Sequence, residues 1–183
     1  MACETYFILK RISSERGADV VNDVMEELYI KYYKELYLYA FSLCKDHHLA
    51  QDLTSDTFFK AYLSLENQDS YIKYWLFKVC RNLFIDLKRK DKEYLSDEYI
   101  ERVEDKSVNL LYRMIETERK RELFQEILKL KEAYKEVLIL YYYCDFSVLE
   151  ISESKKLNEG TVKTLLFRGR KKLKKRLEDN NGL

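Results

Sequence analysis

Apolar side chains recur every three or four positions along most of this chain, and this spacing predicts helices. A first long helix is predicted to end at about Cys44, and a second to run from Leu49 to about Leu65, with Asp46 as its N-cap. A third is predicted from about Ser70 to Lys90. The stripe of the first helix consists of Val21, Val24, Leu28, Tyr32, Leu36, Tyr39 and Leu43.

The third predicted helix carries its own apolar stripe beside a row of Lys and Arg side chains. Its buried face is expected to hold Trp75 or Leu76, followed by Val79, Leu83 and Leu87. We expect Trp75 to lie in the core. Three helices of this kind can close a small bundle.

The helical spacing of apolar residues weakens over residues 93–118, which contain eight acidic and three basic side chains. This stretch is interpreted as a solvated linker. Helical spacing returns at Leu123, Ile127 and Leu130, and continues into a short helix at Ser147 to Lys155 and a final basic helix. The sequence therefore predicts an all-α protein with two small helical domains, 1–92 and 113–183, joined by a flexible acidic linker, 93–112.

Composition supports helices and argues against several other classes. The chain has 183 residues with no proline and four glycines, and it is 46% hydrophobic and 36% charged. This combination is typical of amphipathic helices with hydrated outer faces. Four widely spaced cysteines are interpreted as reduced thiols, and His47 and His48 as surface residues. No metal site, cofactor, nucleophile with a matched base or small-molecule substrate is indicated, so we do not expect an enzyme.

Positive charge is concentrated near the C-terminus. Residues 158–177 contain eight Lys or Arg and one acid, a local charge of +7, whereas the whole chain has a net charge of +1. Residues 73–92 also carry a surplus of five positive charges, while 19–69 carry a surplus of six negative charges. A cationic helix attracts phosphate whatever the total charge of the protein, so DNA binding is predicted.

The C-terminal pattern is that of a helix-turn-helix. Ser147 and Glu150 have the spacing of a capping box, and Asn158 can cap the second helix, while Gly160 leaves room for a close neighbour or a phosphate. Val162, Leu166 and Leu173 are predicted to pack inward. The residues predicted to bind DNA are Asn158 and Thr161, then Lys163, Thr164, Phe167 and Arg168 in reach of base edges, and Arg170, Lys171 and Lys172 near phosphates. The alternative is a cationic terminal helix on a solvated surface.

Several motifs in the same order resemble the extracytoplasmic-function (ECF) sigma factors of bacterial RNA polymerase. The C-terminal motifs resemble domain four of that family, and the N-terminal motifs resemble its D-L-V-Q-E-T-F-x-K-A-Y and W-L-x-x-I-A-R-N-x-x-x-D helices. Together they span about 150 residues. The stretches that carry the resemblance are Asp52 to Tyr62, Trp75 to Asp86, Ala133 to Tyr142, Glu150-Ile151, Gly160 to Thr164 and Phe167 to Leu173.

This resemblance implies roles for both halves of the chain. The basic C-terminal helix would read the minus-thirty-five element of a promoter, and Asp52, Asp56 and Lys60, which share one helix face, would dock on the basic clamp helices of core RNA polymerase. A simple ion pair between Asp56 and Lys60 is the alternative explanation of that spacing. The residues implied for the minus-ten element are Tyr71, Lys78, Arg81, Asn82, Lys88 and Arg89.

The resemblance also implies partners and a location. They are core RNA polymerase, through its clamp helices and flap, promoter DNA, and an anti-sigma factor, with the protein in the cytoplasm or held at the membrane by that factor. Leu165 stands where the family often has arginine, which removes one DNA contact. A dimeric helix-turn-helix regulator that acts without polymerase is the competing hypothesis, and it should protect a palindrome unaided.

Overall fold

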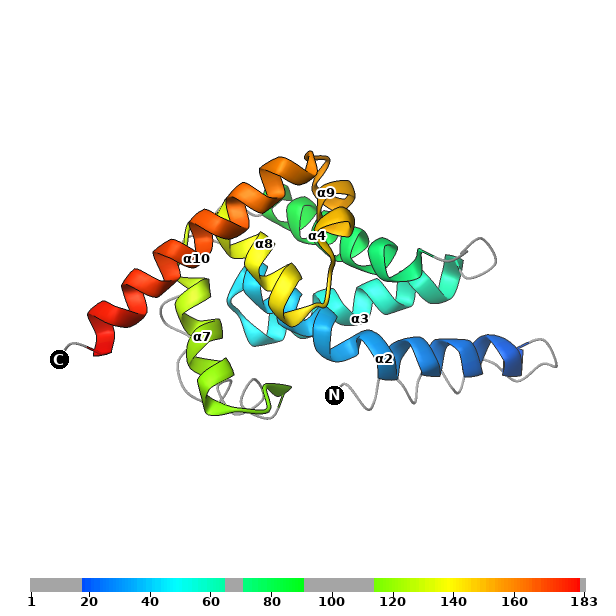
Figure 1. The fold of residues 1–183 in the computed structure, drawn as a ribbon. Helices are drawn as coiled ribbons and strands as arrows, with labels where there is room; N and C mark the ends of the chain where they lie inside the picture. Colours follow the sequence, from blue (N-terminus) through cyan, green and yellow to red (C-terminus); the bar gives the residue numbers. More distant parts are fainter. Residues whose placement is uncertain (1–17, 65–70, 91–113, 182–183) are drawn as a thin grey trace. The chain divides into compact units, whose positions relative to one another are not determined.

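The computed structural model describes residues 18–64, 71–90 and 114–181, and these residues form helices without strands (Figure 1). They divide into two compact units, Met1–Ile100 and Glu101–Leu183. The all-α prediction with two helical domains is confirmed. The predicted linker, 93–112, lies outside the described residues. The helices are α2 (Ala18–Cys44), α3 (His47–Ser64), α4 (Ile72–Lys90), α7 (Glu118–Leu128), α8 (Glu132–Tyr143), α9 (Val148–Lys155) and α10 (Glu159–Asn181).

In the first unit, α2 packs against both α3 and α4. Every residue from Leu36 to Ser42 is buried, so this segment of α2 contributes all its faces to the core, whereas the sequence predicted a single stripe. Contact with two helices explains the difference, because each neighbour covers a different face. Near the start of α2 the predicted stripe does not hold, since Val24 is 41% exposed.

The turn between α2 and α3 is fixed by local hydrogen bonds. Lys45 adopts a left-handed backbone with φ of 56°, and the Asp46 carboxylate accepts a bond of 2.7 Å from the backbone N–H of Leu49, as its predicted capping role requires. The prediction of a surface position is wrong for His47, which is buried, and right for His48. The His47 ring lies 4.5 Å from that of Phe41.

The buried imidazole of His47 has a specific partner. Its Nδ1 atom is hydrogen-bonded to the hydroxyl of Tyr37 on α2. Burial disfavours the protonated imidazolium and lowers the pKa of His47. The histidine therefore belongs to the core at the junction of α2 and α3.

Helix α4 buries Leu76, Phe77 and Cys80, and its Lys73 forms an ion pair of 3.1 Å with Glu35 of α2. Two predictions on this helix need correction. Trp75 is only partly buried, because the buried position is that of its neighbour Leu76. Leu87 is 38% exposed and does not belong to the core, since all five residues at the C-terminal end of α4 are exposed.

In the second unit, α10 packs against α7, α8 and α9. Phe124 and Ile127 of α7 and Leu138 of α8 are fully buried. A Cβ atom on Gly169 would lie 3.0 Å from Leu138 Cδ1, so the missing side chain lets α10 approach α8. At Gly160 the sequence predicted room for the preceding helix or a phosphate; a Cβ atom there would meet only the Asn158 side chain, at 3.3 Å, so no close contact with α9 requires this glycine.

Two charged contacts also join the helices of this unit. Lys155 of α9 pairs with Glu136 of α8, and both side chains are largely buried. Glu126 of α7 accepts a hydrogen bond of 3.0 Å from Arg176 Nε of α10, and one of 2.5 Å from Lys129 Nζ. Burial opposes ionisation of Glu126, but these two cations outweigh it and lower its pKa.

The described cysteines, Cys44, Cys80 and Cys144, are free and buried, in agreement with reduced thiols. Cys3 lies outside the described residues. Burial raises the pKa of the Cys80 thiol to about 12, so this group is held in its protonated form.

Candidate nucleic-acid interface

The helix-turn-helix is built by three local caps. The Ser147 hydroxyl accepts from the backbone N–H of Glu150, and the Glu150 carboxylate accepts from the backbone N–H of Ser147 at 2.7 Å, which completes the predicted capping box. Lys156 ends α9 in a left-handed conformation with φ of 52°. Asn158 Oδ1 then accepts a bond of 2.7 Å from the N–H of Thr161 and starts α10, as predicted.

Helix α10 has a buried face and a cationic face. Val162, Leu166 and Leu173 are buried, as the sequence predicted. Phe167 is 68% exposed, so its ring is available to an external partner rather than to the core. Of the residues predicted to face DNA, Thr161 is half-buried, and the exposed ones are Asn158, Lys163, Thr164, Phe167, Arg168, Arg170, Lys171 and Lys172.

The exposed residues do not all point the same way. Thr164, Arg168 and Lys171 follow one another at spacings of four and three, and so share a stripe. Arg170 and Lys172 instead stack on tyrosines of α8: the Arg170 guanidinium lies 5.3 Å from the ring centre of Tyr141, and Lys172 Nζ lies 5.7 Å from that of Tyr134. These two cations therefore flank the outward stripe.

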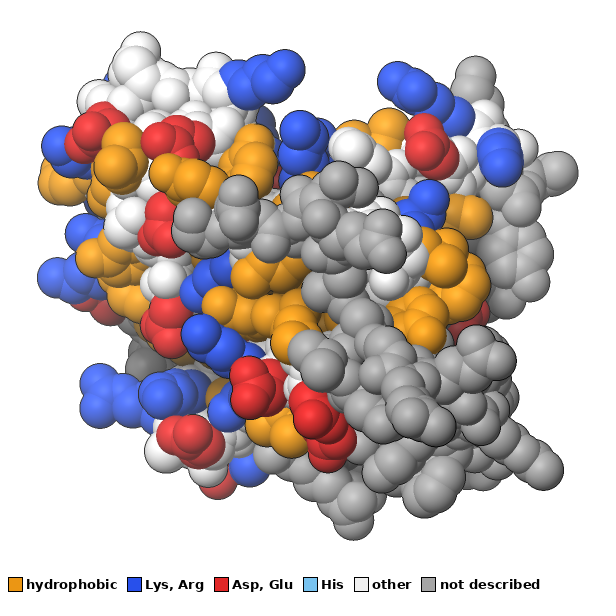
Figure 2. All heavy atoms as spheres, turned by 90° about the vertical axis from the view of Figure 1, so that its right-hand side faces the viewer, with side chains coloured by type: hydrophobic (Ala, Val, Ile, Leu, Met, Phe, Trp, Pro, Cys, Tyr) orange, Lys and Arg blue, Asp and Glu red, His pale blue; other side chains and the backbone are white. Residues whose placement is uncertain are grey.

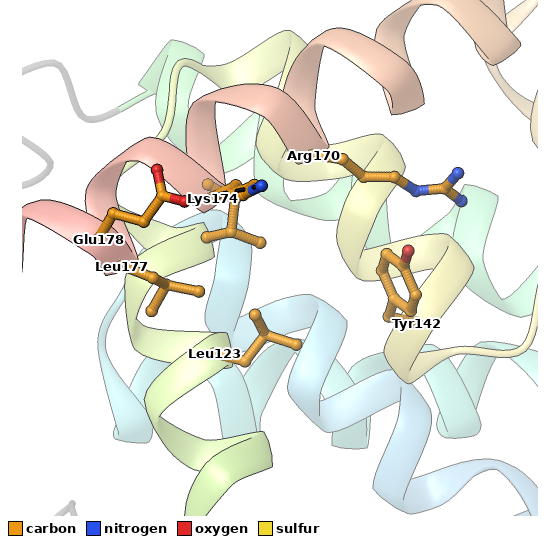
Figure 3. A pocket seen from close by; sticks show the side chains of 7 residues that line it. Leu123, Tyr142, Arg170, Lys174, Leu177 and Glu178 are labelled. Carbon is orange, nitrogen blue, oxygen red and sulfur yellow. Dashed lines mark ion pairs between the residues drawn. The ribbon is translucent and has the colours of Figure 1, made fainter. Parts of the chain in front are cut away.

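Beside Arg170, a groove of about 360 Å³ lies between α7, α8 and α10 (Figure 3). Leu123, Leu173 and Leu177 give it an apolar wall, and Tyr142 lies below the Arg170 guanidinium, 5.6 Å from ring centre to cation. An ion pair between Lys174 and Glu178, at 3.6 Å, lies along its rim. The sequence patterns did not reveal this groove, because its wall is assembled from three helices.

Most of the predicted minus-ten residues form a second exposed row, along α4 and at Tyr71, which directly precedes it. Tyr71, Lys78, Asn82 and Arg89 are exposed, and their spacings of seven, four and seven residues place them on one stripe. The partly buried Trp75 lies at i+4 from Tyr71 and borders this stripe. Arg81, which is half-buried, and the exposed Lys88 are seven residues apart and lie on a neighbouring face.

On α3, Asp52, Asp56 and Lys60 are all exposed on one face, as their spacing predicted. Among the ion pairs between described residues there is none that joins Asp56 to Lys60, so these charges are directed to solvent in this structure. Phe59 and Leu63 extend the same face as exposed apolar residues, at 47% and 67% exposure. Neither follows from the sequence, because periodicity cannot show that an apolar residue has no neighbour to cover it.

The surface chemistry is mixed rather than uniformly basic. In the face drawn in Figure 2, acidic, basic and hydrophobic side chains lie interspersed. Among the described residues, no group of three or more His, Cys, Asp or Glu side chains could hold a metal ion. No helix in the described ranges combines the length and apolar character that crossing a membrane requires.

The fold and its surfaces define a class of protein: two helical units, one with a capped helix-turn-helix, and each with a cationic helix. Comparison with known families gives the same result for each half. The family model of Sigma-70 region 2 matches residues 28–94, and that of Sigma-70, region 4 matches residues 120–173.

Curated relatives agree over nearly the full length. ECF RNA polymerase sigma factor SigM of Bacillus subtilis is 36% identical over 153 residues, which cover 82% of this chain and 93% of SigM. SigW of the same organism is 29% identical over 184 residues, which cover 94% of this chain and 97% of SigW. The chain therefore belongs to the ECF group of the sigma-70-type RNA polymerase sigma factors.

Solved structures show the same fold. Sigma factor RpoE from Bartonella quintana, solved in complex with the anti-sigma factor NepR, is 25% identical with a TM-score of 0.63, covering 84% of this chain and 96% of that chain. CnrH, solved with the cytosolic domain of CnrY, is 20% identical with a TM-score of 0.62 and covers 95% of this chain and 97% of its own.

Proposed function

We propose that this sigma factor binds core RNA polymerase and directs initiation at a specific set of promoters, and that it does so without catalytic chemistry of its own. The observation that carries the proposal is that each matched sigma region presents an exposed cationic helix with polar or aromatic side chains among its cations. Cations hold phosphates, while amides, hydroxyls and rings contact bases.

In this proposal the two domains, 1–92 and 113–183, divide the promoter between them. The stripe on α10 with Thr164, Arg168 and Lys171 reads the minus-thirty-five element, while Arg170 and Lys172 hold flanking phosphates. The stripe on α4 with Tyr71, Asn82 and Arg89 contacts the minus-ten element. The supporting observation is the exposure of nearly all these side chains, which are not needed for the core.

Core polymerase would meet two surfaces. The acidic face of α3, with Asp52 and Asp56, suits the basic clamp helices, because unlike charges attract. The apolar groove lined by Leu123 and Leu177 suits an apolar segment of the flap. Both surfaces would act in the cytoplasm, where polymerase works.

We also propose control by an anti-sigma factor. RpoE of Bartonella quintana was solved with such a partner. The fold of RpoE matches 84% of the length of this chain. An anti-sigma factor that covers either polymerase-facing surface would hold the protein inactive.

The proposal is tested by reconstituted transcription. Purified full-length protein is added to core RNA polymerase from the source organism, and run-off transcripts are mapped over a library of genomic promoters. We expect initiation at a small set of promoters that share a minus-thirty-five motif. Core polymerase alone is the control, and failure to stimulate any promoter would refute the proposal.

A further inference from the structure

One acidic side chain stands at the start of the cationic helix. Glu159 is the only Asp or Glu between positions 158 and 177, and it is the first residue of α10. Its side chain is 48% exposed and forms an ion pair of 3.1 Å with Lys163, one turn further along the helix. Both side chains therefore reach solvent together in the first turns of α10.

Local structure alone gives Glu159 only a small role. A carboxylate at a helix N-terminus interacts favourably with the helix dipole, and an exposed i, i+4 pair adds little. The capping position is already filled, since Asn158 Oδ1 accepts from the N–H of Thr161. A carboxylate at this position also weakens binding to DNA, because nearby phosphates repel it.

The position of Glu159 suggests what offsets this cost. In helix-turn-helix proteins the N-terminal residues of the second helix contact base edges. In the major groove the only hydrogen-bond donors are the exocyclic amines of cytosine and adenine, and adenine carries the acceptor N7 beside its amine. A carboxylate is therefore best accommodated by cytosine N4.

Lys163 complements this chemistry. An ammonium group is a donor only, and it suits the O6 and N7 acceptors of guanine. The ion pair keeps the carboxylate and the ammonium on one face of α10. The Thr164 hydroxyl, by contrast, donates its hydrogen to the backbone oxygen of Gly160, at 2.8 Å, so it is not available to donate to guanine.

We propose that Glu159 determines sequence specificity: it accepts a hydrogen bond from cytosine N4 in the minus-thirty-five element, and Lys163 beside it contacts a neighbouring guanine. This inference rests on the proposed function, because it needs α10 in the promoter major groove. It adds one acidic residue to a proposed DNA-contacting surface whose other charged residues are all Lys or Arg.

The test uses holoenzyme reconstituted from the full-length protein and core polymerase, with a promoter library randomised across the minus-thirty-five element. Wild-type protein should prefer cytosine at one position. Glu159→Ala should reduce that preference about five- to 150-fold while raising affinity for other sequences, since one repulsive charge is gone. Glu159→Gln should shift the preference towards adenine, because an amide pairs with adenine N6 and N7.

The matched control is Glu116→Ala, which removes the acid of another exposed i, i+4 pair, with Lys120, outside α10. It should leave the base preferences unchanged. If Glu159→Ala strengthens binding equally to every sequence, Glu159 is only a repulsive charge and the inference is overturned. If the wild-type holoenzyme initiates at no promoter of the library, that result would instead refute the proposed function. Circular dichroism of each variant checks that its overall helix content equals that of the wild type.

Discussion

At the residue scale, the most specific feature of the proposed minus-thirty-five surface is the outward stripe of α10. Arg168 lies in the middle of this stripe and is exposed, while its neighbour Gly169, about 100° further round the helix, is buried. Adjacent residues on one helix can therefore be changed to separate DNA binding from stability.

Arg168→Ala should weaken binding to the minus-thirty-five element by about 1–3 kcal/mol, because it removes a cation that can contact guanine or phosphate. The measurement is a fluorescence anisotropy titration of the holoenzyme with promoter DNA, alongside a titration of the sigma factor with core polymerase. Core binding should stay unchanged. Arg119→Ala, an exposed change on α7, serves as control, and an equal loss of DNA and core binding would point to misfolding instead.

Gly169→Ala should destabilise the second unit by about 1 kcal/mol. The added methyl meets the fully buried Leu138 at 3.0 Å, and this overpacking outweighs the gain in helix propensity. Urea unfolding followed by circular dichroism measures the effect. Gly160→Ala is the matched control: the position is exposed and the added Cβ meets only the Asn158 side chain, so the gain in helix propensity is not opposed by a buried neighbour and the variant should not be destabilised. Equal stability of the two variants would show that Leu138 has room to move.

At the element scale, the helices of the second unit are tied together by charged as well as apolar contacts. Glu126 links α7 to the C-terminal half of α10 through Arg176, while its own side chain is only 8% exposed. A contact of this kind joins segments that are 50 positions apart, and its strength depends on the ionisation of one carboxylate.

Glu126→Gln should reduce the free energy of unfolding by about 1 kcal/mol at neutral pH. Because the cations lower the pKa of Glu126 in the folded protein, this stabilisation is complete above its unfolded pKa of about 4.3 and is lost as the pH falls through the lower folded value. Urea unfolding from pH 7 to pH 3 should therefore show the gap between wild type and variant closing below about pH 4.

The control for this experiment is Glu178→Gln, which alters an exposed pair on α10. Its unfolding free energy should follow that of the wild type throughout the pH range. A gap for Glu126→Gln that stays constant down to pH 3 would contradict the ionic role of Glu126.

At the scale of the whole molecule, the charges of the chain nearly cancel, yet they are distributed among surfaces with different proposed partners. The acidic face of α3 is proposed for polymerase, and the cationic faces of α4 and α10 for DNA. A net charge of +1 gives no hint of this division.

Asp52→Asn combined with Asp56→Asn should weaken core-polymerase binding roughly tenfold at low salt and less at high salt, because the attraction to a basic partner is screened. The measurement is a titration with labelled core polymerase at two salt concentrations. The control, Asp23→Asn with Glu27→Gln, changes two exposed acids of α2. Equal weakening by both pairs would place polymerase elsewhere or indicate a general charge effect.

The sequence by itself determined the helical class, the two matched regions and the start of each helix in the helix-turn-helix. Amphipathic spacing and capping residues such as Ser147 and Asn158 act within one or two turns, so they can be read without knowledge of the fold. The exposure of Asp52, Asp56 and Lys60 followed from the same local spacing.

Only the tertiary structure decided what each helix packs against. It placed His47 in the core, left Trp75 and Leu87 partly exposed, and gave close helix packing to Gly169 rather than Gly160. It also assembled the groove beside Arg170 and left Phe59 and Leu63 uncovered. The physical reason is that burial depends on which neighbours cover a side chain, and those neighbours lie far away in the sequence.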